Sequence, residues 1–150
     1  MAAGIRDKVA IIGMGCTRFG ELWDKSPEDL MVDAFKEAIE DAKIEKKDIQ
    51  AAWVGTMFSG DTGRCLSEPL KLNYIPVTRV ENMCATGSDA MRNAAYAVAA
   101  GVYDIVLALG FDKLKDTGWA GLGDVPFPGT GRGLIGSQGA SGPSVFALLA

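Results

Sequence analysis

Hydrophobic and polar positions alternate along the chain in blocks that predict strands separated by helices. Short apolar runs with the length of buried strands lie at residues 8–14, 49–58, 77–82 and 102–109. Between the first two runs, apolar residues at 30–42 recur at three- and four-residue steps, the pattern of a helix with one buried face. Strands that alternate with helices are typical of a parallel sheet with right-handed crossovers, so we predict an α/β fold.

Capping residues and small residues indicate where the helices begin and how they pack. Ser26, Pro27 and Asp29 form a start signal, because serine caps, proline needs no N–H partner in the first turn and the acid completes a capping box. A later predicted helix at residues 88–100 holds six alanines in its last eleven residues, and Gly101 is suited to end it. So many small side chains indicate a helix pressed between two layers.

Two further expectations complete the predicted fold. Residues 64–72 have the composition of a short helix between the second and third strands. The run at 102–109 is almost wholly apolar, as strands buried on both faces of a parallel sheet are, so we expect it to be central.

After these elements the chain becomes rich in glycine. Residues 117–142 hold nine glycines, which predicts a loop region, and residues 143–150 begin another helix. We therefore divide the chain into an α/β part at 1–116, the glycine-rich start of a loop region at 117–142 and the helix start at 143–150. That last helix has no cap and no polar final turn, so we expect the working protein to have a further C-terminal half.

Composition narrows the classes of function. The 150 residues carry 15 Lys and Arg against 19 Asp and Glu, and a mildly acidic chain is poorly suited to nucleic acid. No apolar run has the length of a membrane span, no signal peptide stands out and three cysteines are too few for a disulfide framework. We therefore expect a cytoplasmic protein with free thiols and no membrane partner. The sequence has no His, so we predict no metal site and no imidazole base within it.

Cys84 is the main candidate for chemistry. It lies between the strand predicted at 77–82 and the following helix, where unpaired N–H groups and the positive end of the helix dipole stabilise a thiolate. The carboxyl end of a parallel strand is also where α/β sheets place their sites. The spacing leaves two interpretations open, a nucleophile and a buried structural thiol. Cys16 and Cys65 lack this setting, and we expect both to be structural.

Two glycine-rich motifs are weaker candidates. Gly13-Met14-Gly15 follows a predicted strand, but Arg18 stands where the dinucleotide-binding pattern needs its third glycine. Residues 129–133 lack the Gly-Lys-Ser/Thr ending of a phosphate loop, although Arg132 is a candidate contact for an anionic substrate.

Residues 77–90 carry a family resemblance and read Val-Thr-Arg-Val-Glu-Asn-Met-Cys-Ala-Thr-Gly-Ser-Asp-Ala. This segment resembles the nucleophile segment of the thiolases, closest to the sterol-carrier-protein-type and acetyl-CoA acetyltransferase branch. The opening residues 9–21 resemble the family's first strand and loop, and residues 101–116 resemble the strand after the nucleophile helix. The resemblance therefore extends along most of the chain, with several motifs in the same order.

The thiolase resemblance implies both a fold and a reaction. The fold has two similar α/β halves packed in layers, and this chain resembles the N-terminal half, a parallel-rich sheet with the nucleophile helix buried between sheets. The reaction cleaves or forms a 3-oxoacyl-CoA through an acyl thioester on Cys84, with coenzyme A as acyl acceptor and no bound cofactor. The same resemblance makes the backbone N–H of Cys84 an oxyanion donor and gives Asn82 and Gly87 supporting roles.

The resemblance also implies partners and missing groups. A homodimer or a dimer of dimers is expected, with the strand at 77–82 near the dimer seam. Because some relatives bind a small zinc-ribbon protein that helps bring in CoA substrates, a zinc-ribbon/OB-fold partner protein is also a candidate. The family's activating His and second Cys belong to the other half, so this chain alone is expected to be incomplete for catalysis. The glycine-rich region would help shape the acyl pocket, with the candidate lining residues Trp119, Phe127 and Arg132.

Two alternative functions remain open. A β-ketoacyl synthase-like condensing enzyme uses a similar Cys to join carrier-bound acyl groups, and a non-catalytic subunit would keep the fold as a partner-binding platform. Relatives that act as aldolases lack the nucleophilic Cys, so Cys84 counts against that activity.

Overall fold

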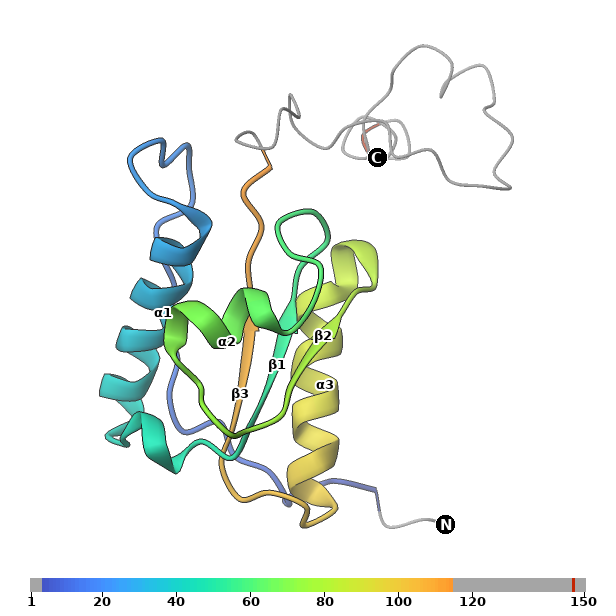
Figure 1. Ribbon diagram of the computed structural model, residues 1–150. Coiled ribbons are helices and arrows are strands. Elements are labelled where there is room, and N and C mark those ends of the chain that lie inside the picture. Colours follow the sequence, from blue (N-terminus) through green and yellow to red (C-terminus); the bar gives the residue numbers. More distant parts are fainter. Residues whose placement is uncertain (1–3, 115–146, 148–150) are drawn as a thin grey trace. The chain divides into compact units, whose positions relative to one another are not determined.

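The computed structural model describes residues 4–114 and residue 147, and its regular elements form an α/β arrangement (Figure 1). The chain divides into two units, residues 1–112 and 113–150, and the elements belong to the first. In chain order they are helix α1 (Pro27–Ala42), 3₁₀ turn η1 (Lys46–Asp48), strand β1 (Ala51–Gly55), helix α2 (Arg64–Leu70), strand β2 (Val77–Val80), 3₁₀ turn η2 (Met83–Ala85), helix α3 (Thr86–Ala99) and strand β3 (Val106–Gly110).

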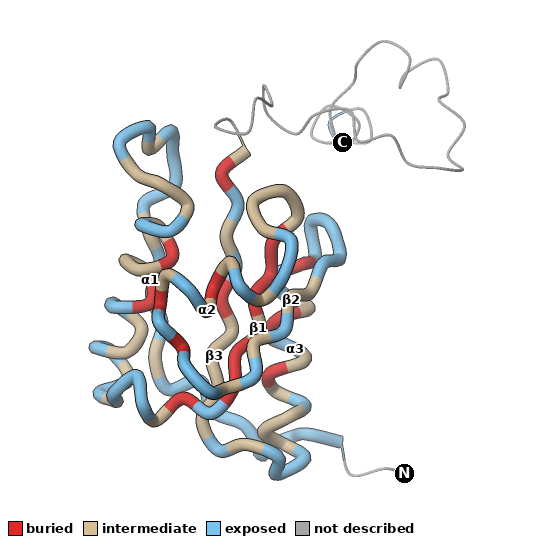
Figure 2. The backbone as a smooth tube through the Cα atoms, viewed as in Figure 1, coloured by how far each residue is buried: buried red, intermediate tan, exposed pale blue. Residues whose placement is uncertain are grey.

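The described strands form a parallel sheet in the order β2-β1-β3. The pairing brings Gly55 at the end of β1 opposite Val80 of β2 and Gly110 of β3, so all three strands end at one edge. The predicted parallel α/β fold is confirmed. The prediction that the strand within 102–109 is central was wrong for this sheet, because β3 lies at its edge while β1 occupies the centre and is the more deeply buried strand (Figure 2).

Helices α1 and α2 cover one face of the sheet. Met31 and Phe35 of α1 pack with Leu66 of α2 against Val54 of β1 and Leu109 of β3, and all five side chains are buried. Their burial is the main source of stability on this face, because it removes a large apolar area from water. The predicted apolar stripe of the first helix is therefore the stripe that faces this core.

The start of α1 follows its sequence signal. The Ser26 hydroxyl accepts a hydrogen bond from the Asp29 N–H at 3.1 Å, and the Asp29 carboxylate accepts one from the Ser26 N–H at 2.9 Å. Pro27 occupies the first turn, where the helix needs no N–H. The helix ends at Lys43, whose φ of 55° turns the chain away from the helix axis. The predicted capping box is confirmed.

Helix α3 covers the other face of the sheet. Ala90 and Ala94, one turn apart, are buried against it, whereas Met91 and Tyr96 are 47% and 52% exposed. The predicted close packing of small residues is present on the side that faces the strands, while Met91 and Tyr96 are exposed on α3. Gly101, with φ of 72°, ends the helix region as predicted.

Residues 8–14 form no strand in the structure, contrary to the prediction from their apolar pattern. The end of this segment lies along α1 instead. The Met14 N–H donates to the Asp41 carboxylate at 2.9 Å, and the Cys16 N–H donates to the Glu37 carboxylate at 3.0 Å. These acids face the chain from consecutive turns of α1. The backbone donors are therefore satisfied by side chains of a helix rather than by a neighbouring strand.

Two glycines allow this segment to lie close to α1. A Cβ on Gly13 would stand 2.4 Å from the Ala38 carbonyl oxygen, and a Cβ on Gly15 would stand 2.1 Å from the Ala34 carbonyl oxygen. Neither position has room for a larger residue, whereas Met14 between them is 69% exposed. Gly13-Met14-Gly15 thus serves packing against the helix.

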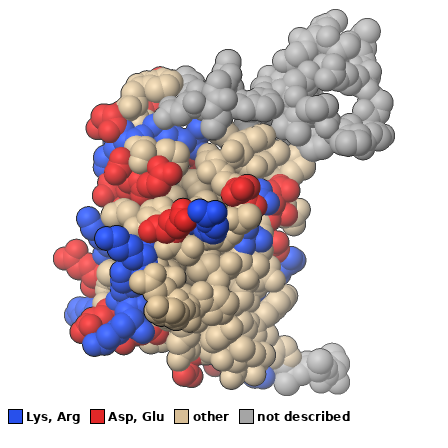
Figure 3. All heavy atoms as spheres, viewed as in Figure 1, with Lys and Arg blue, Asp and Glu red and all other residues tan. Residues whose placement is uncertain are grey.

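The face of the molecule seen in Figure 3 carries charges of both signs, gathered mainly over α1 and its flanking turns. Lys25 pairs with Asp33, and Lys47 pairs with Glu45 at 2.8 Å. No helix in the described ranges is long and apolar enough to cross a bilayer.

Replacing Gly13 with Ala should loosen the N-terminal segment from α1. The added methyl would meet backbone rather than a flexible side chain, so we expect an unfolding free energy lower by about 1–3 kcal/mol. Urea denaturation and limited proteolysis near residue 13 would measure the effect. Met14→Ala is the matched control, since its exposed side chain should change the unfolding free energy by less than about 0.5 kcal/mol. Equal effects of the two substitutions would contradict the close contact.

Candidate functional site

The loops that leave the three strands meet at the carboxyl edge of the sheet (Figure 1). The turn η2 follows β2 at this edge and leads directly into α3. Cys84 is the middle residue of η2, and it is exposed. The thiol therefore stands two residues before the first turn of α3, at the edge where parallel sheets usually place their sites.

Hydrogen bonds to backbone groups shape the turn around Cys84. Met83 has a φ of 50°, a left-handed conformation that non-glycine residues rarely adopt. Its N–H donates to the Glu81 carboxylate at 2.5 Å, and its carbonyl oxygen accepts from the Thr86 hydroxyl at 2.6 Å. The same hydroxyl accepts from the Asn82 N–H at 2.8 Å. Asn82 and Met83 before Cys84, and Thr86 after it, are thus held in place by hydrogen bonds.

The first turn of α3 rests directly on the end of β1. A Cβ on Gly55 would lie 2.9 Å from Cγ2 of Thr86 and 3.1 Å from its carbonyl oxygen. Thr86 is only 6% exposed, although it is polar and adjoins an exposed turn. This contact sets how far η2, and with it Cys84, stands from the sheet.

Asp112 ties the end of β3 to the loop after β1. Its carboxylate accepts four hydrogen bonds of 2.9–3.0 Å, from the Thr56 hydroxyl and from the N–H groups of Met57, Phe58 and Ser59. Thr56 itself is fully buried. A carboxylate that accepts hydrogen bonds from several backbone N–H groups holds a loop in place, much as a side chain caps a helix. The loop after β1 is therefore fixed at this edge of the sheet.

Arg79 of β2 joins the same network. Its Nη2 donates to the Thr56 carbonyl oxygen at 2.8 Å, while its buried Nε has no hydrogen-bond partner among the described residues. The three strand ends are therefore linked by polar contacts from β2 through β1 to β3. The sequence alone assigned no role to Arg79, Thr56 or Asp112. Its only signal was position: Thr56 and Asp112 follow strand ends, and Arg79 is the penultimate residue of β2.

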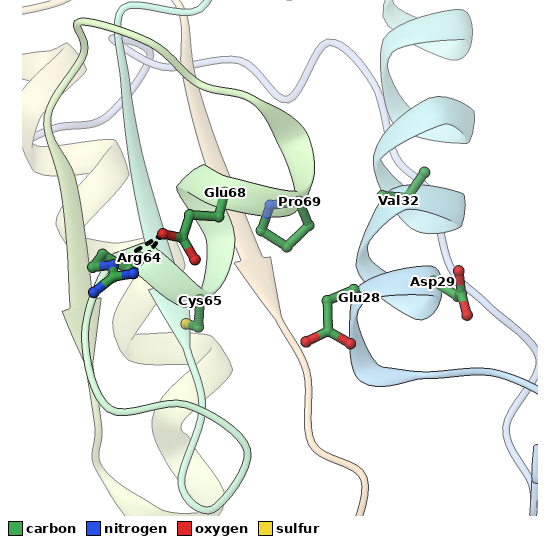
Figure 4. A pocket seen from close by; sticks show the side chains of 7 residues that line it. All are labelled: Glu28, Asp29, Val32, Arg64, Cys65, Glu68 and Pro69. Carbon is green, nitrogen blue, oxygen red and sulfur yellow. Dashed lines mark hydrogen bonds and ion pairs between the residues drawn. The ribbon is translucent and has the colours of Figure 1, made fainter.

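The other two cysteines have different surroundings. Cys65, on α2, is half-buried in a groove of about 310 Å³ between α2 and the start of α1 (Figure 4). Burial raises the pKa of the Cys65 thiol, and the positive charge of Arg79 only partly opposes this effect. The groove also holds the ion pair of Arg64 and Glu68 at 2.6 Å. Cys16 is exposed on the segment that lies along α1.

The structure brings three of the candidate site residues together. Asn82 directly precedes η2, Cys84 lies within it and Gly87 lies in the first turn of α3; a Cβ on Gly87 would meet nothing within 4 Å among the described residues. The open space at Gly87 leaves the backbone accessible beside the thiol. The candidate pocket residues lie outside the described residues: Trp119, Phe127 and Arg132.

No cluster of three or more potential metal ligands occurs within residues 4–114. At this edge the Cys84 thiol is exposed, and backbone N–H groups lie around it. The Cys84 N–H has no hydrogen-bond acceptor in the described part of the chain. Fold and site together define an α/β protein with an exposed thiol before a helix that packs on the sheet, at the carboxyl edge of its parallel strands.

A family model described as "Thiolase, N-terminal domain" matches residues 9–120, and the chain accordingly belongs to the thiolase family. The resemblance inferred from residues 77–90 is confirmed. The chain is 38% identical over 150 residues to an acetyl-CoA acetyltransferase of Methanothermobacter thermautotrophicus, covering 95% of this chain and 38% of the relative. It is 46% identical over 114 residues to an acetyl-CoA acetyltransferase of Methanocaldococcus jannaschii, covering 72% of this chain and 29% of the relative.

Solved structures agree on the fold. The Acat5 thiolase of Ascaris suum, determined in complex with coenzyme A, matches with a TM-score of 0.58 and 23% identity, over 79% of this chain and 32% of that one. At this identity the likeness concerns the fold alone. The chain thus spans about two fifths or less of the length of these relatives.

Replacing Gly55 with Ala should displace the first turn of α3, because the new methyl would press on Thr86. We expect a loss of about 1–3 kcal/mol in unfolding free energy and an altered alkylation rate of Cys84. Gly110→Ala is the matched control: it lies opposite Gly55 in the sheet, but its nearest contact would be an ordinary 3.7 Å. Denaturant unfolding of the two variants would test this, and equal destabilisation would show that the Thr86 contact is not the constraint.

Proposed function

We propose that the protein is a thiolase-type acyltransferase in which Cys84 is the nucleophile toward a 3-oxoacyl-CoA. The observation that carries the proposal is the position of Cys84, an exposed thiol just before α3 at the carboxyl edge of the sheet. Family membership supports it, since two relatives are named acetyl-CoA acetyltransferases. The Cys65 thiol is less suited, because it is half-buried and burial raises its pKa.

The proposed reaction transfers an acyl group in two steps. The Cys84 thiolate attacks the 3-oxo carbon, the bond between C2 and C3 breaks, and its electron pair leaves on acetyl-CoA as the enolate, which then takes up a proton. The acyl group remains on Cys84 as a thioester. In the second step the thiolate of coenzyme A attacks this thioester, which releases acyl-CoA and restores the Cys84 thiolate. The reverse sequence is a Claisen condensation.

The backbone around Cys84 suits the charge that develops on the substrate oxygen. Its N–H has no acceptor among the described residues and lies beside the first turn of α3. An N–H in this position can donate to the oxyanion of the tetrahedral intermediate, and loss of one such donor typically lowers the rate by about 10²–10³. We assign this role to the Cys84 N–H.

Proton transfer needs groups beyond this site. The sequence has no His, and the carboxylate of Glu81, three residues before Cys84, already accepts the Met83 N–H. General acid–base catalysis contributes about 10²–10⁴ in rate. We propose that the acid–base groups and the acyl pocket, including Trp119, Phe127 and Arg132, come from outside the described residues.

The proposal extends to the setting in which the enzyme works. We expect a cytoplasmic homodimer or dimer of dimers with β2 near the dimer seam, acyl-CoA as substrate and no bound cofactor. A zinc-ribbon or OB-fold protein is the expected kind of further partner.

Iodoacetamide should distinguish the three thiols at neutral pH. We expect the fastest alkylation at Cys84 and the slowest at Cys65, because burial raises the pKa of the Cys65 thiol and leaves less thiolate at pH 7. Alkylation of Cys65 should accelerate only as the pH rises above the usual thiol range. Exposed Cys16 serves as the reference, and peptide mass spectrometry would assign each adduct. Uniformly slow alkylation of all three thiols would favour a non-catalytic platform.

Activity measurements should then link the thiol to the reaction. In the full protein, Cys84→Ser should lower the rate of 3-oxoacyl-CoA thiolysis by at least about 10³, because a serine hydroxyl is a far weaker nucleophile at this position. Cys16→Ser should retain the rate of the unsubstituted protein. Full activity of Cys84→Ser would refute the proposal. Condensation of carrier-bound acyl groups without thiolysis of acyl-CoA would favour a β-ketoacyl synthase instead.

A further inference from the structure

The hydroxyl of Thr86 binds the chain on the N-terminal side of Cys84 at two points. Its oxygen accepts a hydrogen bond from the Asn82 N–H at 2.8 Å, and its proton is donated to the Met83 carbonyl oxygen at 2.6 Å. The Thr86 backbone N–H also donates to that carbonyl oxygen. These contacts close a small ring of residues 82–86 with Cys84 at its centre. One hydroxyl thus acts as donor and acceptor at the same time.

The ring holds a strained residue next to the thiol. Met83 has a φ of 50°, which is unfavourable for a side chain with a Cβ, and such conformations persist only where their surroundings impose them. Here the surroundings are the Glu81 carboxylate, which accepts the Met83 N–H, and Thr86, which donates to the carbonyl oxygen. The conformation of Met83 directs the chain into Cys84. Restraint of Met83 therefore restrains the nucleophile.

The methyl group of Thr86 anchors this ring to the sheet. Cγ2 faces Gly55 so closely that a Cβ there would lie 2.9 Å away, and the Thr86 side chain is almost fully buried. The hydroxyl and the methyl thus face different partners, the turn and the strand. Because they are separate, substitutions can remove them one at a time.

We propose that Thr86 is a positioning residue whose hydroxyl holds Met83 in its left-handed conformation and thereby sets the direction of the Cys84 thiol. This inference rests on the proposed role of Cys84 as the nucleophile. Thr86 is buried beneath the turn, so it acts through the backbone of residues 82 and 83 rather than on substrate. Its effect belongs to the chemical step, because displacement of a nucleophile by about 1 Å can lower a rate a hundredfold.

Two variants in the full protein separate the hydroxyl from the methyl. Thr86→Val keeps the shape that meets Gly55 and loses the hydroxyl; Thr86→Ser keeps the hydroxyl and loses the methyl. We expect Thr86→Val to lower kcat for thiolysis by about tenfold to a hundredfold, with KM within about twofold, and to slow alkylation of Cys84 while Cys16 is unaffected. Thr86→Ser should retain kcat within about threefold. A Thr86→Ser variant as impaired as Thr86→Val, or a Thr86→Val variant with normal kcat, would overturn the proposal.

A second substitution tests whether the hydroxyl acts through Met83. Glycine adopts a φ of 50° without strain, so Met83→Gly added to Thr86→Val should restore much of the alkylation rate of Cys84. Absence of any rescue would overturn the assignment to Met83. Alkylation also separates this inference from the proposed function: if the unsubstituted protein never cleaves 3-oxoacyl-CoA, the function fails, while a Cys84 alkylation rate that depends on the Thr86 hydroxyl still supports the positioning role.

Discussion

The contact between α3 and the end of β1 is the constraint on which the candidate site depends. Gly55 has no side chain, so Thr86 can lie directly on the strand, and a Cβ at Gly55 would be 2.9 Å from its methyl. Ala90 and Ala94 continue this buried line at successive turns of the helix. One small or compact residue per turn brings the helix axis close to the sheet over its length. The turn η2 is therefore held at the carboxyl edge of the sheet, with Cys84 exposed within it.

Hydrogen bonds of Asp112 and Arg79 hold the loops at the ends of the strands, in addition to the helix packing. Helix packing alone would leave the strand ends free to splay, but the Asp112 carboxylate accepts four hydrogen bonds from the loop after β1. Arg79 reaches the Thr56 carbonyl oxygen from β2 on the other side. Hydrogen bonds to charged groups are stronger than those between neutral groups, and they are directional. The loops at this edge are thus held by interactions that depend on orientation as well as on burial, which suits a site whose geometry must be maintained.

Much of this architecture could be predicted from sequence because its signals are local. The capping box at Ser26 uses residues three apart, and the apolar runs that form the strands are continuous. Residues 8–14 show where this reasoning fails. Their hydrophobicity predicted a sheet strand, but the backbone donors of Met14 and Cys16 bind carboxylates of α1 instead. An apolar pattern does not show which element, far away in the sequence, a segment will lie against.

The same limit applies to the candidate site. The position of Cys84 between a strand and a helix could be read from the chain, and so could the residues that resemble the thiolases. The role of Asp112 could not, because its partners lie more than fifty residues away and three of the four are backbone N–H groups, which every sequence contains. The role of Thr86 could not be predicted from sequence for a different reason. It belongs to the recognisable motif, yet its importance lies in two hydrogen bonds that appear only once the turn is folded.

These observations separate the placing of the proposed nucleophile from its activation. The contacts that place Cys84 come from this part of the chain: Gly55 beneath Thr86, the hydroxyl of Thr86 against the turn, and the Glu81 carboxylate on the Met83 N–H. The sequence supplies no imidazole to take the thiol proton. In the proposed enzyme the described residues would hold the sulfur in one direction, and groups elsewhere would have to meet it there. A rigid, over-determined turn is what such an arrangement requires, because a base contributed from another part of the protein can act on the thiol only if the thiol does not move.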